Sequence, residues 1–133
     1  MLEYVEIREF LYAIVIRDAR SAPGVNFITD GRAILQVGTM RHPTGHKIQP
    51  HRHLPYKRNT EGTQEVLFLR SGVLKVSFFC EKFKEVGNIL LNTGDTIILM
   101  GGAHGFEIIE EVDMIEVKNG PYASFEDKER FSW

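Results

Sequence analysis

Residues 64–80 read QEVLFLRSGVLKVSFFC, two apolar segments separated by Ser71-Gly72. Successive side chains of a β-strand point to opposite faces, so Glu65 and Leu67 share one face of the first segment and Phe68 lies on the other. Serine and glycine favour the local hydrogen bonds and positive φ angles of a chain reversal. The stretch therefore predicts two short strands joined by a turn, each with one face against a core.

Short apolar segments between Gly, Asn and Asp residues recur along the chain, and none keeps a 3.6-residue apolar repeat for three turns. An all-β fold is therefore expected, with turns at Asn92-Thr93-Gly94-Asp95 and at Gly101-Gly102. No internal repeat or linker interrupts residues 1–133, which predicts a single domain built as a sandwich or closed barrel. The predicted strands are Leu11–Arg17, Arg32–Arg41, His46–His53, Gln64–Leu69, Val73–Cys80, Glu85–Leu91, Thr96–Leu99, Gly105–Ile109 and Asp113–Lys118.

The composition is that of an ordinary globular domain: 43% of the 133 residues are apolar, 26% are charged and the formal charge is −2. Cys80 is the only cysteine, so no intramolecular disulfide can form and a cytoplasmic location is expected. The apolar run Phe10–Ile16 is too short to span a bilayer. Arg52, Lys57 and Arg58 do not make the extended basic stripe that nucleic-acid binding needs. Neither a membrane nor a nucleic acid is an expected partner.

Four residues of metal-ligating type stand where strand geometry can bring them together. His51 and His53 are separated by one residue, so in a strand both imidazoles point to the same face. Glu65 would be an isolated carboxylate facing an apolar interior, a charge that a cation stabilises. His104 lies among glycines that permit a tight inward turn. Three imidazoles and one carboxylate suit one divalent transition metal (Fe, Mn, Ni, Cu or Zn) rather than Ca or Mg.

Taken singly, each of these four residues also fits an ordinary loop or surface position, but their order and spacing resemble the two sequence motifs of the cupin superfamily. The gap of eleven residues between His53 and Glu65 is longer than is usual in that family and implies a long hairpin loop. Leu99 and Ile108 stand where the second motif usually has proline and asparagine. The matching positions are Gly45, His51, His53, Glu65 and Gly72 in the first motif and Gly94, Asp95, Gly101 and His104 in the second.

The resemblance implies a cupin double-stranded β-helix, which is a jelly-roll-like antiparallel barrel. It also implies that His51, His53, Glu65 and His104 hold one metal ion. A homodimer is expected, because cupins commonly pack or exchange N-terminal strands. Val66 and Phe68 on the outer face of the barrel would also need cover from N-terminal strands or from a second subunit.

A metal with open coordination positions suits Lewis-acid or oxygen chemistry, so we expect an enzyme acting on a small oxygen-rich metabolite such as a hydroxy acid or sugar. The reaction type stays open between oxygenation and isomerisation or epimerisation. Two alternatives remain: a non-catalytic module that binds a sugar or organic acid, and a metal-free nucleotide-sugar isomerase or epimerase. Tyr56 and Glu107 are general-base candidates by residue type alone, so no catalytic residue is assigned. The candidate substrate-binding residues are Gln36, Arg41, Gln49, Tyr56, Lys57 and Phe106.

Overall fold

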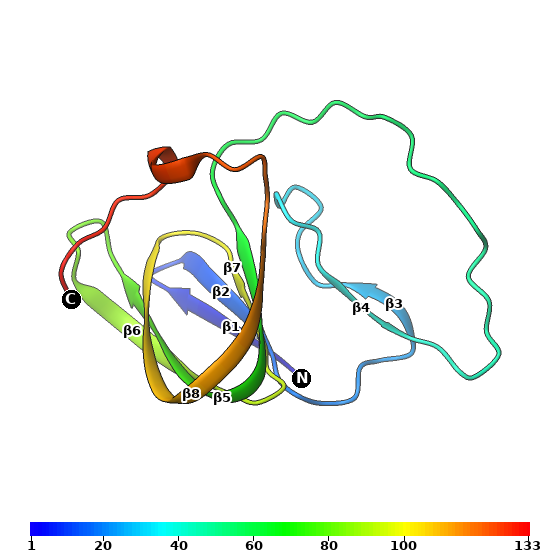
Figure 1. Ribbon diagram of the computed structural model, residues 1–133, viewed down its shortest axis with the longest axis horizontal. Helices are drawn as coiled ribbons and strands as arrows, with labels where there is room; N and C mark the ends of the chain where they lie inside the picture. Colours follow the sequence, from blue (N-terminus) through cyan, green and yellow to red (C-terminus); the bar gives the residue numbers. More distant parts are fainter.

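The structure of the protein is a computed structural model that describes residues 1–124 and 127–133. It is all-β, as expected: a six-stranded antiparallel sheet curls into a half-barrel, and a two-stranded sheet lies beside it (Figure 1). Within these described residues, no helix has the length and apolar character needed to cross a membrane. The elements are β1 (Leu2–Ile7), β2 (Phe10–Ile16), β3 (Gly24–Phe27), β4 (Gly38–Arg41), β5 (Glu65–Phe79), β6 (Glu85–Asn92), β7 (Thr96–Leu99), β8 (Ala103–Lys118) and the 3-10 helix η1 (Ser124–Asp127).

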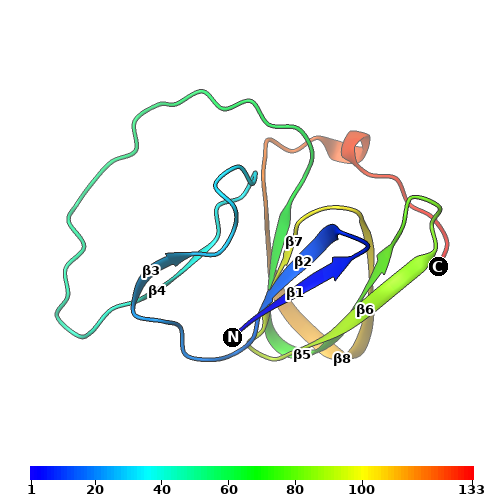
Figure 2. The ribbon, with the colours of Figure 1, turned by 180° about the vertical axis from the view of Figure 1, so that it is seen from behind.

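β5 and β8 are the long strands on which the half-barrel is built. The strand order is β1-β2-β7-β5-β6, and β8 pairs with β5 along most of its length. On its other side β5 changes neighbour: its first part pairs with β7, with Glu65 opposite Leu99, and its later part pairs with β6, with Val73 opposite Asn92. The sheet bends where this change occurs, and the strands curl around a common interior (Figure 2).

The predicted reversal at Ser71-Gly72 is wrong, because the chain bends there without turning back. β5 continues through both residues, and its pairing with β8 slips in register between Leu69 and Leu74. Gly72 has φ +99°, and a Cβ atom at this position would collide with the backbone of Glu111. The glycine therefore serves a bulge, where a strand bends and twists more strongly, rather than a turn. β8 is likewise one strand where two were predicted.

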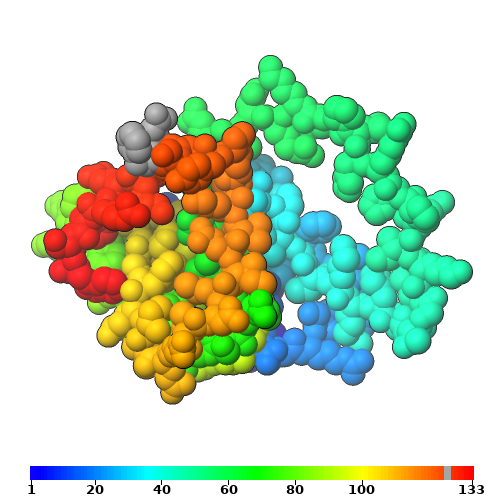
Figure 3. All heavy atoms as spheres, viewed as in Figure 1, coloured from blue at the N-terminus to red at the C-terminus, as the bar shows by residue number. Residues whose placement is uncertain are grey.

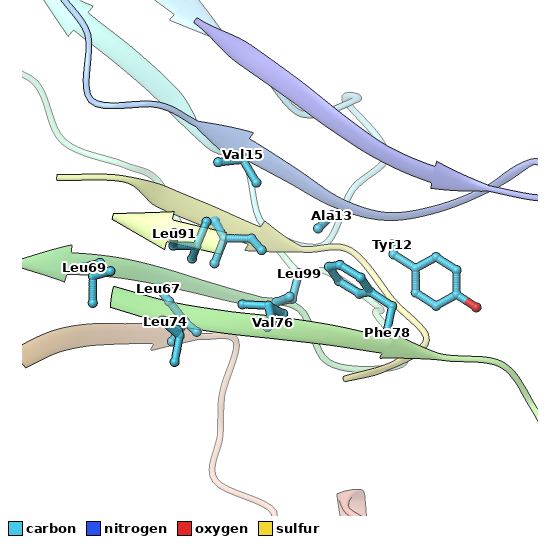
Figure 4. Close-up of a cluster of buried hydrophobic side chains, with 11 residues drawn as sticks. Tyr12, Ala13, Val15, Leu67, Leu69, Leu74, Val76, Phe78, Leu91 and Leu99 are labelled. Atoms are coloured by element: carbon cyan, nitrogen blue, oxygen red, sulfur yellow. The ribbon is translucent and has the colours of Figure 1, made fainter. Parts of the chain in front are cut away.

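The core lies on the inner face of the half-barrel, where strand alternation predicted it. Leu67 and Leu69 are 2% and 1% exposed, whereas Phe68 between them is 40% exposed. Val76 and Phe78, from the later part of β5, join the same cluster. Figure 4 shows these side chains meeting others from β2, β6 and β7. Full burial of one such side chain contributes about 1.5–3 kcal/mol relative to exposure.

Residues 43–62, called the arm below, are exposed throughout and form no strand. The predicted strand His46–His53 is therefore wrong, and the predicted strand Arg32–Arg41 is reduced to β4. A strand is stable only beside a neighbour, and the arm stands away from the half-barrel on the side of β3 and β4 (Figure 3). Pro50 and Pro55 also remove two backbone donors from this stretch.

Asp95, in the predicted turn between β6 and β7, is 3% exposed and accepts hydrogen bonds from several elements. Its Oδ1 accepts a hydrogen bond from the Asp18 N–H (2.9 Å), and its Oδ2 accepts from the Asn92 N–H (2.9 Å) and Arg17 Nη1 (2.8 Å). Its backbone carbonyl accepts from the Leu69 N–H (2.9 Å). Burial acts to raise the pKa of Asp95, but the hydrogen bonds and the Arg17 charge together outweigh it and lower the pKa.

We expect Asp95→Ala to lower the free energy of unfolding by about 3 kcal/mol, because two backbone N–H groups and the Arg17 guanidinium lose their acceptor. Asp113→Ala is the matched control, since Asp113 pairs with Arg70 at 3.5 Å on the surface and its loss should cost under about 1 kcal/mol. Urea denaturation at neutral pH measures both values. Equal costs would contradict the role given to Asp95.

The pKa of Asp95 also predicts a pH dependence. Because this pKa is lower in the folded than in the unfolded chain, its contribution to stability is complete above the unfolded value, near about 4, and is lost as pH falls through the folded value. The wild type should therefore lose more stability than Asp95→Ala on acidification below about pH 5. Parallel urea titrations across this range give the comparison, and identical slopes would sink the prediction.

Candidate functional site

Two of the four predicted metal ligands face each other at one end of the half-barrel. Glu65 begins β5, where it pairs with Lys118 of β8, and His104 is the second residue of β8. His104 Nε2 lies 3.3 Å from Glu65 Oε2, and the Glu65 side chain is only 13% exposed. Gly102, with φ +75°, lies in the short connection from β7 to β8 that brings His104 beside Glu65.

The surroundings of Glu65 keep its carboxylate ionised. Hydrogen bonding to His104 is the largest influence on the pKa of Glu65 and lowers it, while partial burial acts in the opposite direction. The positive charges of Lys118 and Lys128 lower this pKa further. Glu65 therefore presents an anionic oxygen to the His104 ring, in a position largely screened from solvent.

A cavity of about 840 Å³ adjoins the Glu65–His104 pair. Glu65, His104 and Phe106 line it from the sheet, and all of residues 127–133, the C-terminal segment, except Ser132 line it as well. This segment runs along the end of the half-barrel (Figure 1). The volume falls within the range of small-molecule sites. Glu116 from β8 and Lys128 from the C-terminal segment add charged groups to its wall.

Aromatic contacts hold the C-terminal segment against the sheet. The Phe79 ring centroid lies 5.3 Å from that of Phe131 and 5.8 Å from that of Trp133, both in edge-on geometry. Gly105 leaves room for the indole, since a Cβ atom there would lie 3.0 Å from Trp133. The sequence analysis missed this wall. The sequence feature that could have indicated this wall is the pair Phe131 and Trp133 in a charged stretch, but nothing in the sequence shows which surface these rings cover.

His51 and His53 lie on the exposed arm and are separate from the Glu65–His104 pair. Their rings are close to one another, with centroids 5.3 Å apart, and His51 Nδ1 lies 3.0 Å from the Gln49 carbonyl oxygen. As the described side chains are placed, no group of three or more His, Cys, Asp or Glu residues could hold a metal ion. The arrangement thus brings together two of the four predicted ligands.

The candidate substrate-binding residues are also divided. Phe106 lines the cavity, with its ring 5.2 Å from that of His104. Gln36 donates hydrogen bonds to the Asp30 and Ala33 carbonyl oxygens, and Arg41 donates to the Ser21 carbonyl oxygen, so both stabilise their own loops. The remaining candidates are exposed on the arm, away from the lining of the cavity: Gln49, Tyr56 and Lys57.

Comparisons of the chain with protein-family models, with curated proteins and with solved structures found no match. The chemistry of the site is therefore argued from its own residues. Glu65 and His104 allow two uses. The carboxylate and the imidazole can act as neighbouring ligands of one cation, or the carboxylate can orient the imidazole for proton transfer.

Gly105→Ala tests how the C-terminal segment is seated. The new methyl group would meet the Trp133 ring, which should move away from β8 at a cost in stability under about 1 kcal/mol. Trp133 is the only tryptophan and is already 67% exposed, so its emission is a poor readout, and the nuclear Overhauser contact between the Trp133 and Phe79 rings, which should weaken, is measured instead. Gly31→Ala is the control, because a Cβ atom there has nothing within 4 Å. An undiminished Overhauser contact in Gly105→Ala would refute this seating of Trp133.

Proposed function

We propose that this protein is a metal-binding cupin, an enzyme acting on a small oxygen-rich metabolite such as a hydroxy acid or sugar. His51, His53, Glu65 and His104 would hold one divalent transition metal, which supplies Lewis-acid polarisation of ligand oxygens when bound. The Glu65–His104 pair beside the cavity carries the proposal. Its separation of 3.3 Å suits two adjacent ligands of one ion, which lie about 3 Å apart when each bond is about 2.1 Å.

The site residues have distinct roles in this proposal. Glu65 contributes the negative charge that a cation requires, and its lowered pKa keeps that charge in place. Phe106 gives the ligand an apolar surface beside His104, and the C-terminal segment restricts access of water from the end of the half-barrel. Glu65 and His104 supply two of the four proposed ligands. His51 and His53 supply the other two only if they approach this pair, which requires the arm to change position.

The length of the arm permits that approach. His53 is ten residues before Thr63, which lines the cavity, and ten extended residues span up to about 35 Å. Among the described strands, β8 pairs only with β5, so its outer edge has no partner strand, and residues near both of its ends line the cavity. Chain length and the open edge therefore both allow the two arm histidines to meet Glu65 and His104.

Metal content is the first test. Wild-type protein, purified without affinity metals and incubated with Fe(II), Mn(II), Ni(II) or Zn(II), should retain about one equivalent of one of these ions by elemental mass spectrometry. His51→Ala combined with His104→Ala should lose it, because two imidazole ligands are gone. Asp30→Ala combined with Arg32→Ala is the control and should retain it, because this exposed ion pair lies outside the arm and the site. Wild-type protein free of metal under all these conditions would overturn the metal proposal.

Metal binding should also protect the arm from proteolysis. The arm carries four trypsin sites, at Lys47, Arg52, Lys57 and Arg58, and its exposure makes them accessible. Adding the retained metal should slow cleavage at these sites severalfold in the wild type. The same metal should have no effect on a variant carrying His51→Ala and His53→Ala, and mass spectrometry of the fragments identifies each cut. Protection that persists in this variant would mean that the metal acts elsewhere.

The Glu65–His104 geometry also favours a second candidate, a metal-free sugar isomerase or epimerase in which Glu65 orients His104 for proton transfer. This candidate predicts full turnover after exhaustive chelation and a large loss of turnover in His104→Gln. The metal-dependent enzyme predicts that chelation abolishes turnover and that one metal restores it. A non-catalytic binding module predicts ligand binding by calorimetry with no turnover in either state.

A further inference from the structure

The outer edge of β8 is a long strand edge with no neighbour among the described residues. β8 has 16 residues and pairs with β5 alone. An edge of this length presents a row of free backbone donors and acceptors, which native proteins cover, interrupt or charge. Its apolar side chains are also open to solvent, with Ile109 50% exposed and Val117 54% exposed. Such an edge is a ready template for another extended chain.

β8 and the arm have opposite charge. β8 carries five acidic residues and one lysine, whereas the arm carries four basic residues and one glutamate. Two of the acids have partners on β5: Glu107 lies 3.9 Å from Lys75, and Asp113 lies 3.5 Å from Arg70. Glu116 lies 4.0 Å from Lys118 of β8 itself, which leaves Glu110 and Glu111 as the acids without such a partner among the described side chains. The acids of β8 are Glu107, Glu110, Glu111, Asp113 and Glu116, and the basic residues of the arm are Lys47, Arg52, Lys57 and Arg58.

The arm also has the pattern of a strand that lacks a neighbour. Ile48 is 55% exposed and Leu54 is 70% exposed, so apolar side chains on the arm match the open apolar side chains of β8. Pro50 has no N–H, so in an added strand its backbone nitrogen must face away from β8. Backbone groups of successive strand residues point to opposite edges, so the odd-numbered residues of the arm would then form the hydrogen bonds to β8. Those residues include His51 and His53. Pro55 ends the usable stretch.

We propose that residues 46–54 of a second copy of this chain add as a strand to the free edge of β8, and that the two copies exchange arms. The contacts of Asn119 at one end of the arm, together with the outward course of the arm, favour a second copy over the chain's own edge. At one end the Asn119 side chain accepts from the Gln64 N–H (2.9 Å) and donates to the Gly62 carbonyl (3.1 Å). At the other end His42 stacks on His46, with ring centroids 4.3 Å apart. Between these contacts the arm projects outward from the half-barrel (Figure 1).

The exchange would make the metal site a shared one, which is the part of this inference that rests on the proposed function. The His104 end of β8 borders the cavity, so an arm lying along this strand passes beside it. His51 and His53 from the second copy would then join Glu65 and His104 of the first. Each copy would supply half of each site.

Cross-linking tests the exchange without reference to metal. In a Cys80→Ser background, Gln49→Cys on one copy and Ile109→Cys on another are mixed and treated with a short bismaleimide. Severalfold more cross-linked dimer than in a mixture of Gln49→Cys with Tyr4→Cys, reduced by high salt, supports the proposal. Tyr4 is a suitable control because it is 55% exposed and lies on β1. No enrichment would overturn the proposal. A variant carrying both Gln49→Cys and Ile109→Cys that cross-links only within its own chain would overturn it as well.

Complementation then tests the shared site. A variant carrying His51→Ala and His53→Ala should bind no metal alone, and neither should one carrying Glu65→Ala and His104→Ala. Mixing equal amounts of the two under exchange conditions should restore about a quarter of the wild-type metal content, because about half of the dimers are then mixed and one of the two sites in each mixed dimer is intact. Cross-linking without restored metal would leave the exchange standing and remove the shared site. Metal binding by the wild type without intermolecular cross-linking would leave the proposed function standing and refute the exchange.

Discussion

The half-barrel depends on the buried carboxylate of Asp95. A turn between two short strands has few apolar contacts of its own, and this one is stabilised by an anion that accepts from two backbone N–H groups and from Arg17. Through those bonds the end of β2 is fixed to the turn that joins β6 and β7, and the Asp95 carbonyl fixes the turn to β5 through Leu69. The positions of the core side chains follow, because they lie on the strands that these bonds align.

The strands predicted well from the sequence are those whose side chains alternate between core and solvent. The segment 64–69 is the clearest case, since the buried Leu67 and Leu69 flank the exposed Phe68. Thr96–Leu99 was predicted with its observed ends, because Gly94-Asp95 and Gly101-Gly102 mark both of them. Where prediction failed, the residues were ambiguous. A glycine with positive φ suits a bulge as well as a turn, so Gly72 did not reveal that β5 continues. β1 and β3 are largely exposed, and although Val25 and Phe27 alternate with Gly24 and Asn26 in β3, four residues are too few for this pattern to identify a strand.

The candidate site was predicted in part, for a related reason. Glu65 and His104 were expected to face a common interior, and the structure places them 3.3 Å apart. The side of the cavity formed by Phe131 and Trp133 was missed, because packing partners distant in sequence leave no local pattern. His51 and His53 stay a prediction as ligands. Their spacing suits a strand, but whether they occupy one depends on a neighbour that local sequence does not specify.

The pairing of β5 with β8 has a consequence for how the protein is made. Phe78 lies opposite His104 and Glu65 lies opposite Lys118, so residues far apart in the chain must meet before the half-barrel exists. Hairpins such as β1 with β2 and β5 with β6 can form from local contacts, but pairs distant in sequence form late and slowly. A chain emerging from the ribosome would therefore hold these hairpins with their apolar faces uncovered until β8 has been synthesised. During that interval the nascent protein is most exposed to aggregation and most in need of chaperone binding.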